Sequence, residues 1–404
     1  MKYRKPSLWH YRLAQGICWT FAKLFFRRKV LRNEIKNAKG PFVVIANHQA
    51  AFDFVNLIGL TKRPMTFVIS NSFYNSLPIT KFLDKLGVIP KQQFQTALSD
   101  MKKAKAVVDA GQPLVIYPAG LMCEDGLSTP IPAATCKFLR WLGADVYAAK
   151  VSGTYFAMPK WGRGIRRGRT YIDVYQLMSA EELAATDLDT IYEKTMDALD
   201  FDAYRQQEQL MERYGKGCQI DGLEHVLYRC PHCGQEYTIC VRDHSALFCN
   251  MCGYEQVSDD YGFLHNEKGI GPEIRYVSDW SREIFHSLLE QVETGSVTEL
   301  SAQTQIQMID FRTHKFVPVG EGTVTLSKDG FRVDGVMHGE PVVLDVPVST
   351  IPTLPFSPGK YFEVQSGKNI YRCVLADGRL VMKFINLVKA FYLLSHPTQS
   401  PVRK

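Results

Sequence analysis

Between residues 41 and 176, short apolar runs alternate with longer stretches of helical character. A nearly continuous apolar run is typical of a strand that is buried on both faces of a sheet. Strands of this kind, separated by helices, predict an α/β domain in which helices flank the sheet. We expect strands at 42–46, 65–69, 114–117, 146–149 and 171–174, and helices at 52–60, 79–86, 95–110 and 133–142.

The first 40 residues carry the positive charge of the chain. They contain eleven Lys and Arg and one Glu, which gives them a net charge of +10 and leaves −3 for the remainder. Residues 8–26 predict a helix with apolar residues at near-helical spacing. This basic helix either lies in the surface of an anionic membrane or packs on the protein core. A basic excess confined to one aromatic segment argues against a nucleic-acid-binding protein.

The chain shows no signal-peptide pattern and no window of ~18 uninterrupted apolar residues that would predict a membrane-spanning helix. Four of its ten cysteines form two C-x-x-C pairs, and the others are scattered singly. In a chain of this length, that distribution is typical of metal binding in a reducing compartment. We therefore expect a cytoplasmic protein that is peripheral on the inner face of the membrane.

The two cysteine pairs form the pattern C-x2-C-x15-C-x2-C. Each pair predicts a tight turn, and the intervening length suits a β-hairpin that brings the two turns together. The expected product is a zinc ribbon with a closed, structural Zn²⁺ site. Its acidic surroundings argue against a nucleic-acid ligand. The predicted ligands are Cys230, Cys233, Cys249 and Cys252.

The sharpest local pattern lies where the predicted strand at 42–46 ends. Asn47-His48 follows the strand, and Asp53 stands at the expected start of a helix. A carboxylate that binds one ring nitrogen of a histidine leaves the other nitrogen able to take a proton from a hydroxyl. This is the base and orienting half of a catalytic triad, in which the substrate alcohol supplies the attacking oxygen. The other interpretation is a structural histidine at a helix start.

Residues 10–210 resemble the glycerolipid acyltransferases of the lysophosphatidate (1-acylglycerol-3-phosphate) type. The resemblance rests on Asn47-His48-x4-Asp53, on Leu86-Gly-Val-Ile-Pro-Lys91, on Val115-Ile-Tyr-Pro-Ala-Gly120 and on the strand around Lys150. It implies transfer of a fatty-acyl group from acyl-CoA or an acyl-carrier protein to a hydroxyl of a lysophospholipid. His48 would be the general base, and Asp53 would orient it. The matched positions expected to bind substrate are Asn47, Lys91, Tyr117, Gly120 and Lys150.

The chain departs from the family pattern at the acceptor site. The third motif normally carries Glu and then Arg, where this chain has Ala119 and Met122, and the second motif usually ends on Arg, where Lys91 and Gln92 are nearest. We expect other cations to hold the acceptor phosphate, because guanidinium and ammonium groups bind phosphate oxygens. The alternative is a catalytically degenerate adaptor that binds lipid or a protein partner through its other domains. The candidate cations are Lys91, Lys150, Lys160, Arg163, Arg166, Arg167 and Arg169.

From about residue 304 to 380 the pattern changes to short alternating strands with turn signals, followed by a helix at 381–394. This small β-barrel-like domain weakly resembles pleckstrin-homology and GRAM-type domains. We expect the following order: a membrane-surface helix at 1–40, the acyltransferase domain at 41–178, a helical connector at 179–224, the zinc ribbon at 225–260, a linker helix at 261–300 and the small β domain at 301–404.

Overall fold

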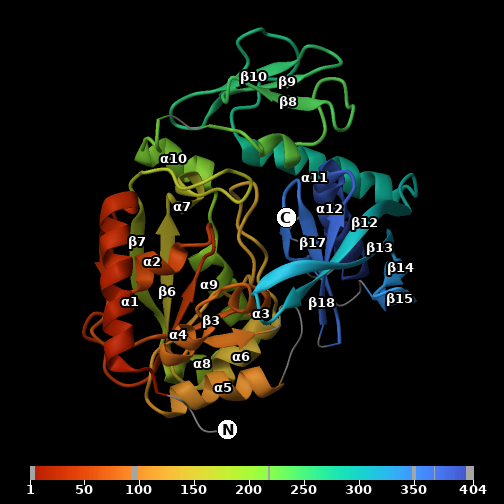
Figure 1. Ribbon diagram of the computed structural model, residues 1–404. Coiled ribbons are helices and arrows are strands. Elements are labelled where there is room, and N and C mark those ends of the chain that lie inside the picture. Colours follow the sequence, from red (N-terminus) through yellow and green to blue (C-terminus); the bar gives the residue numbers. More distant parts are fainter. Residues whose placement is uncertain (1–4, 92–97, 217–218, 348–351, 368, 397–404) are drawn as a thin grey trace. The chain divides into compact units, whose positions relative to one another are not determined.

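The computed structural model describes residues 5–91, 98–216, 219–347, 352–367 and 369–396. These residues form two compact units (Figure 1). The first unit comprises 1–218 and 260–262, and the second comprises 219–259 and 263–404. Gln92 and the first three residues of the helix predicted at 95–110 lie outside the described residues.

The first unit contains a seven-stranded sheet with the strand order β1-β7-β6-β2-β5-β3-β4. β6 and β7 pair antiparallel, and the other neighbours pair parallel. The predicted α/β architecture is therefore confirmed. The sequence did not predict β1 and β4, because β1 is largely exposed and β4 has three residues, so neither presents a continuous apolar run. The bounds are β1 Lys29–Asn33, β2 Phe42–Ala46, β3 Thr66–Ser70, β4 Ile89–Lys91, β5 Leu114–Ile116, β6 Asp145–Ser152 and β7 Tyr171–Met178.

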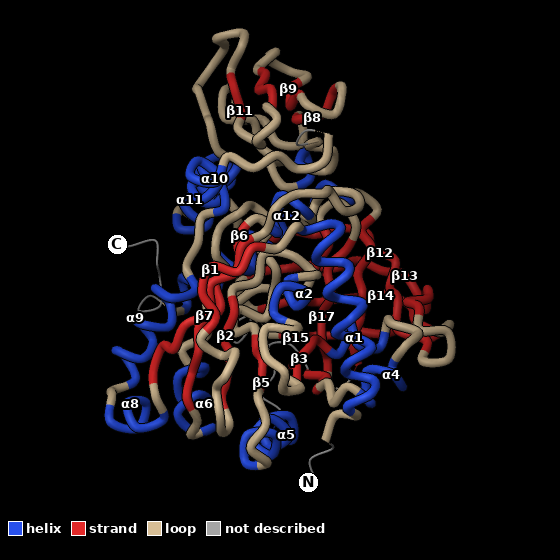
Figure 2. Tube along the Cα trace, turned by 90° about the vertical axis from the view of Figure 1, so that its left-hand side faces the viewer, coloured by secondary structure: helices blue, strands red, loops and turns tan. Residues whose placement is uncertain are grey.

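Helices cover both faces of this sheet (Figure 2). Val43 and Ile45 of β2 pack toward helices α5, α6, α8 and α9, whereas Phe42 and Val44 pack on the face that carries α2. This division follows from the alternation of side chains along a strand. The helices are α1 Leu8–Phe21, α2 Asp53–Leu57, α3 Asn71–Asn75, α4 Thr80–Lys85, α5 Leu98–Asp109, α6 Ala134–Leu142, α7 Thr154–Ala157, α8 Ala180–Ala185, α9 Leu188–Leu199 and α10 Ala203–Leu210.

The N-terminal helix packs on the first unit along one side and exposes the other. α1 continues as a π-helical segment, Ala22–Phe26, so the predicted helix at 8–26 is present. Tyr11 and Ala14 pack against Ile58, which immediately follows α2. Among the described residues, no helix has the length and apolar character that crossing a bilayer requires.

The second unit contains two antiparallel sheets and two longer helices. The small sheet has the order β11-β10-β9-β8, and the large sheet has the order β15-β14-β13-β12-β18-β17-β16. Phe384 of α12 packs 5.2 Å from Phe362 in the large sheet, measured between ring centroids. The bounds are β8 Ile239–Arg242, β9 Ala246–Cys249, β10 Glu255–Ser258, β11 Leu264–His265, α11 Val277–Glu293, β12 Glu299–Asp310, β13 Lys315–Ser327, β14 Gly330–Met337, β15 Glu340–Val346, β16 Phe356–Ser357, β17 Tyr361–Ser366, β18 Asn369–Leu375 and α12 Val381–Ser395.

The four-cysteine region is joined to the two long helices of the second unit. The indole nitrogen of Trp280 in α11 donates a hydrogen bond to the carbonyl oxygen of Arg229 at 2.9 Å. Lys383 of α12 pairs with Glu236 at 2.6 Å. Both contacts lie beside the first cysteine pair, so α11 and α12 support the segment that carries Cys230 and Cys233.

Candidate functional site

His48 and Asp53 lie together at the carboxyl end of the first unit's sheet. β2 ends at Ala46, and Asp53 is the first residue of α2, so the loop between them brings the two side chains together. His48 Nδ1 lies 2.9 Å from Asp53 Oδ2. Because a carboxylate only accepts hydrogen bonds, Nδ1 is the protonated ring nitrogen and Nε2 is left as an acceptor. The Asp53 side chain is fully buried, and the His48 side chain is 19% exposed.

The main chain of the same loop holds the Asp53 carboxylate. The backbone N–H groups of Gln49 and Ala50 donate to Asp53 Oδ2 at 2.7 and 2.9 Å. Together with His48, they give this one oxygen three hydrogen bonds. His48 and Asp53 form no ion pair with a lysine or arginine in the part of the chain that the structure describes. The pair is therefore held by the loop itself, and it leaves one imidazole nitrogen for chemistry.

Two buried amide side chains fasten the loop to the rest of the sheet. Asn47 donates to the carbonyl oxygen of Val151 at 2.8 Å and accepts from the Val151 N–H at 2.7 Å. Gln49 Oε1 accepts from the Thr154 hydroxyl and from the Tyr155 N–H, both at 3.2 Å. We expected Asn47 to contact substrate, but its side chain is 3% exposed and both of its polar groups bind Val151. We therefore revise its proposed role to that of a positioning residue.

Gln49 is a site residue that the sequence interpretation missed. The signal was available, because an uncharged polar residue in a loop that follows a buried strand must find partners once the loop is covered. Those partners, Thr154 and Tyr155, lie far along the chain and could not be inferred from local sequence.

The segment that follows β5 lies directly against this loop. The Tyr117 and His48 rings lie 4.5 Å apart between centroids, with an angle of 31° between their planes. The backbone N–H of Cys123 donates to the carbonyl oxygen of His48 at 3.1 Å. Gly120 adopts a positive φ of 71°, and its N–H closes a turn onto the Tyr117 carbonyl at 3.0 Å. The structure thus brings the segment with Tyr117 and Gly120 close to His48. The Gly120 N–H is already hydrogen-bonded within the turn.

The other predicted substrate-binding residues lie on separate elements. Lys91 ends β4, the strand at the edge of the sheet, and is exposed. Lys150 follows Ala149, which pairs with Ala46, so it lies beside the end of β2. Strand alternation places Lys150 on the same face as Ala148 and Val146, opposite to Tyr147. This face is the one covered by α5, α6, α8 and α9, whereas Tyr117 packs on the other.

The arginine cluster is divided among several contacts. Arg166 lies over the Trp161 ring, 5.3 Å from its centroid, and Arg163 is exposed. Arg167 donates to the carbonyl oxygen of Leu24 at 3.0 Å, and Arg169 pairs with Glu212 at 3.1 Å. The cluster therefore does not converge on one point.

Lys160 is the candidate cation that the structure ties to the third motif. Its ammonium donates a hydrogen bond to the carbonyl oxygen of Met122 at 3.4 Å. The next residue, Cys123, binds the His48 carbonyl, so the ammonium lies within about 9 Å of that oxygen by standard backbone dimensions. The positive charge thus lies near the position where the family motif would carry its arginine.

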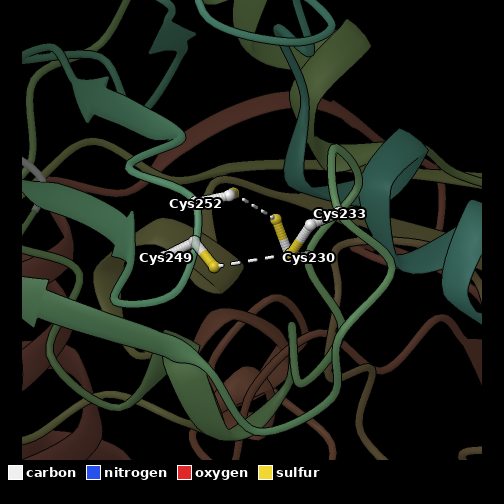
Figure 3. Close-up of side chains that lie close together, drawn as sticks. All are labelled: Cys230, Cys233, Cys249 and Cys252. Atoms are coloured by element: carbon white, nitrogen blue, oxygen red, sulfur yellow. Dashed lines mark hydrogen bonds between the residues drawn. The ribbon is translucent and has the colours of Figure 1, made fainter.

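The four predicted metal ligands converge in the second unit (Figure 3). Cys230 Sγ lies 3.7 Å from Cys252 Sγ, and Cys233 Sγ lies 3.8 Å from Cys249 Sγ. A tetrahedral site with metal–sulfur bonds of ~2.3 Å places its sulfur atoms ~3.8 Å apart. The cluster therefore has the dimensions of a four-thiolate site and can hold a structural metal ion.

Hydrogen bonds favour a thiolate at Cys249, whereas burial raises the pKa of Cys230 and of Cys252. Burial alone would raise the pKa of Cys249, but the Thr238 hydroxyl and the backbone N–H groups of Cys252 and Met251 lower it to about 6. The turn of the first cysteine pair ends at Gly234 and that of the second pair ends at Gly253. Their φ values are 74° and 76°. Residues with a side chain rarely adopt such angles, which accounts for a glycine after each cysteine pair.

Comparison with known proteins finds a family match for the segment around His48. A family model described as "Acyltransferase" matches residues 27–163, which include β2, α2 and the Tyr117–Cys123 segment. This part of the chain is therefore an acyltransferase domain. No curated protein matches the chain.

Two solved structures are similar to parts of the chain. One is the 1-acyl-sn-glycerophosphate (LPA) acyltransferase PlsC from Thermotoga maritima, with 18% identity over 46% of this chain and 80% of that chain, at a TM-score of 0.38. The other is the Ran-binding domain of Nup2 from Ashbya gossypii, with 16% identity over 24% of this chain and 99% of that chain, at a TM-score of 0.19.

Proposed function

We propose that this protein transfers a fatty-acyl group from an acyl-CoA or acyl-carrier-protein thioester to a hydroxyl of a lysophospholipid. The observation that carries the proposal is the bond between His48 Nδ1 and the buried Asp53 carboxylate, inside a segment that matches the acyltransferase family. In such a pair the carboxylate holds the imidazole with Nε2 unprotonated, so that Nε2 can act as a general base in acyl transfer.

The reaction begins with the acceptor hydroxyl at His48 Nε2. As Nε2 takes the hydroxyl proton, the oxygen attacks the thioester carbonyl carbon and a tetrahedral intermediate forms. Asp53 stabilises the imidazolium that results. When the intermediate collapses, the carbon–sulfur bond breaks, the new ester remains on the acceptor, and His48 returns its proton to the departing thiolate. A positioned base of this kind contributes ~10²–10⁴ in rate.

We propose that Lys160 binds the phosphate of the acceptor. Its bond to Met122 places the ammonium close to the catalytic loop. A positive charge near this loop could neutralise the phosphate of an acceptor whose hydroxyl lies at His48. Lys91, Lys150, Arg163 and Arg166 lie on other elements and are the candidates for contacts with the rest of the substrates.

We further propose that α1 and the segment after it bind an anionic membrane surface on its cytoplasmic side. Large apolar side chains are exposed on this segment together with Arg12, Lys23 and Arg27, which matches the composition of helices that lie in a lipid interface. A lysophospholipid resides in such a surface, so this arrangement would bring the enzyme to its acceptor. The exposed apolar residues are Leu8, Trp9, Leu13, Ile17, Trp19 and Leu24.

For the second unit we propose a structural Zn²⁺ ion held by Cys230, Cys233, Cys249 and Cys252. Zinc prefers four thiolates in tetrahedral geometry, and the sulfur spacing fits its bond lengths. The ion would cross-link the two turns and contribute to folding. We propose that the C-terminal sheet and α12 serve as a binding domain for lipid or protein, in the manner of pleckstrin-homology domains.

The proposal is tested by incubating the purified full-length protein with acyl-CoA or acyl-carrier protein and a series of acceptors. Lysophosphatidate, lysophosphatidylcholine and monoacylglycerol differ in the charge close to the hydroxyl. We expect a diacyl product with lysophosphatidate, identified by mass spectrometry, and equimolar release of free thiol. Absence of product and thiol with every donor and acceptor would contradict the proposal and support an adaptor.

A further inference from the structure

Two polar atoms in and next to the pair formed by His48 and Asp53 have no hydrogen-bond partner among the described residues. They are the Tyr117 hydroxyl oxygen and Asp53 Oδ1, the second oxygen of the carboxylate. Both atoms are buried. Native proteins pair nearly all such atoms, directly or through ordered water, because an unpaired buried polar group is costly.

The placement of Tyr117 brings its hydroxyl toward the same region as Asp53. Tyr117 follows β5, and its side chain packs on the sheet face that α2 covers. α2 begins at Asp53, and the Tyr117 ring lies against the His48 imidazole. The three side chains therefore share one buried region at the carboxyl end of β2 and β5.

The chemistry of the two atoms is complementary. Burial raises the pKa of Tyr117 well above its usual value of 10, and the negative charge of Asp53 raises it further. The hydroxyl therefore keeps its proton and can donate, whereas a carboxylate oxygen can only accept. A water molecule between them can accept from the hydroxyl and donate to the carboxylate.

We propose that the Tyr117 hydroxyl donates a hydrogen bond to a buried water, which in turn donates to Asp53 Oδ1, and that Tyr117 thereby positions the carboxylate that holds His48. The inference rests on the proposed role of His48 as the general base. His48, Gln49 and Ala50 fix Asp53 Oδ2. A water that Tyr117 holds against the other oxygen would prevent the carboxylate from rotating, which makes Tyr117 a positioning residue.

The direct test is an NMR titration of the His48 ring in the full-length protein with and without the hydroxyl. Tyr117→Phe keeps the ring that packs on His48. A carboxylate that loses a hydrogen-bond donor attracts the imidazolium more strongly, so we expect the pKa of His48 to rise in this variant. An unchanged His48 titration in Tyr117→Phe would overturn the proposal. Tyr147→Phe is the matched control, because Tyr147 is a buried tyrosine on β6 of the same sheet.

A double-mutant cycle shows whether Tyr117 acts through Asp53. In an Asp53→Asn background, the change Tyr117→Phe should no longer move the His48 titration, and an equal shift in both backgrounds would overturn the proposal. The nearby titratable groups Cys123, Glu124 and Asp125 stay the same in all four proteins. This readout needs no turnover, so it decides the role of Tyr117 even if the protein transfers no acyl group.

Kinetics give a second readout that a merely structural role would not reproduce. We expect Tyr117→Phe to lower kcat about tenfold, the size expected for the loss of one hydrogen bond to a charged group, and to leave KM unchanged. A rise in KM with an unchanged kcat would overturn the proposal, because it would place the hydroxyl in substrate binding.

Discussion

The backbone N–H of Cys123 donates a hydrogen bond to the carbonyl oxygen of His48 at 3.1 Å. This bond joins the loop that follows β5 to the loop that carries the proposed base. Lys160 binds the same segment one residue earlier, at Met122. The proposed phosphate contact and the proposed base therefore belong to one connected group of loops.

Replacement of Lys160 by Ala should weaken binding of a phosphate-bearing acceptor. The loss of a charged hydrogen bond worth ~1.5–3 kcal/mol predicts a KM for lysophosphatidate that is about tenfold higher or more, with little change in kcat. The KM for monoacylglycerol, which has no phosphate, should not change. Steady-state kinetics with both acceptors provide the measurement, and Lys194→Ala, an exposed lysine on α9, is the control. Equal effects on both acceptors would refute a phosphate contact.

Replacement of Asn47 by Ala should destabilise the protein and impair transfer. The variant loses both hydrogen bonds to Val151 and leaves the buried N–H and carbonyl of that residue unpaired. We expect the free energy of unfolding to fall by about 2 kcal/mol. Denaturant titration measures this change, and Asn37→Ala, at an exposed position, should have little effect. A stable Asn47→Ala protein with altered KM alone would return Asn47 to a substrate-binding role.

Cys249 and Cys240 offer a matched pair for the metal site. Cys249 is one of the four clustered thiols, whereas Cys240 lies on β8 outside the cluster. Elemental analysis should find one zinc per chain in the wild type and in Cys240→Ser, and much less in Cys249→Ser. Because the ion is expected to support folding, a chelator should lower the unfolding temperature of the first two proteins and not of the third. A wild-type protein that is metal-free and equally stable would contradict a structural zinc site.

Replacement of Ile17 and Leu24 by Ser should reduce binding to anionic vesicles. Their side chains are 59% and 50% exposed, and burial of a large apolar side chain in lipid is worth ~1.5–3 kcal/mol. We expect the double variant to bind at least about tenfold more weakly in sedimentation assays. Leu98→Ser removes a comparably exposed side chain from α5 and should bind as the wild type does. Equal binding by all three proteins would show that α1 has no role at the membrane.

The sequence predicted those parts of the fold whose signals are local. β2 was predicted at its observed bounds because all five of its residues are buried and apolar. β1 was missed because its pairing with β7 on the sheet edge leaves its side chains exposed. β12 and β13 are 12 and 13 residues long, whereas we expected short strands, because mutual pairing extends them beyond the apolar stretches.

In the candidate site, too, local contacts could be predicted from the sequence and contacts between distant residues could not. The contact between His48 and Asp53 followed from a histidine just after a strand and an aspartate five residues later at a helix start. The bonds from Asn47 to Val151 and from Lys160 to Met122 join residues that are distant in the chain. Such contacts depend on strand order and loop paths, which composition and spacing do not contain. For that reason the sequence offered several cations, and only the structure shows that Lys160 contacts Met122.

The central claim is that His48 removes the proton from the acceptor hydroxyl. It is tested most directly by the rate of radiolabelled acyl transfer to lysophosphatidate in the wild type and in a folded His48→Ala variant. We expect measurable transfer in the wild type and a loss of ~10²–10⁴-fold in the variant. Transfer at an undiminished rate without the imidazole would contradict the account.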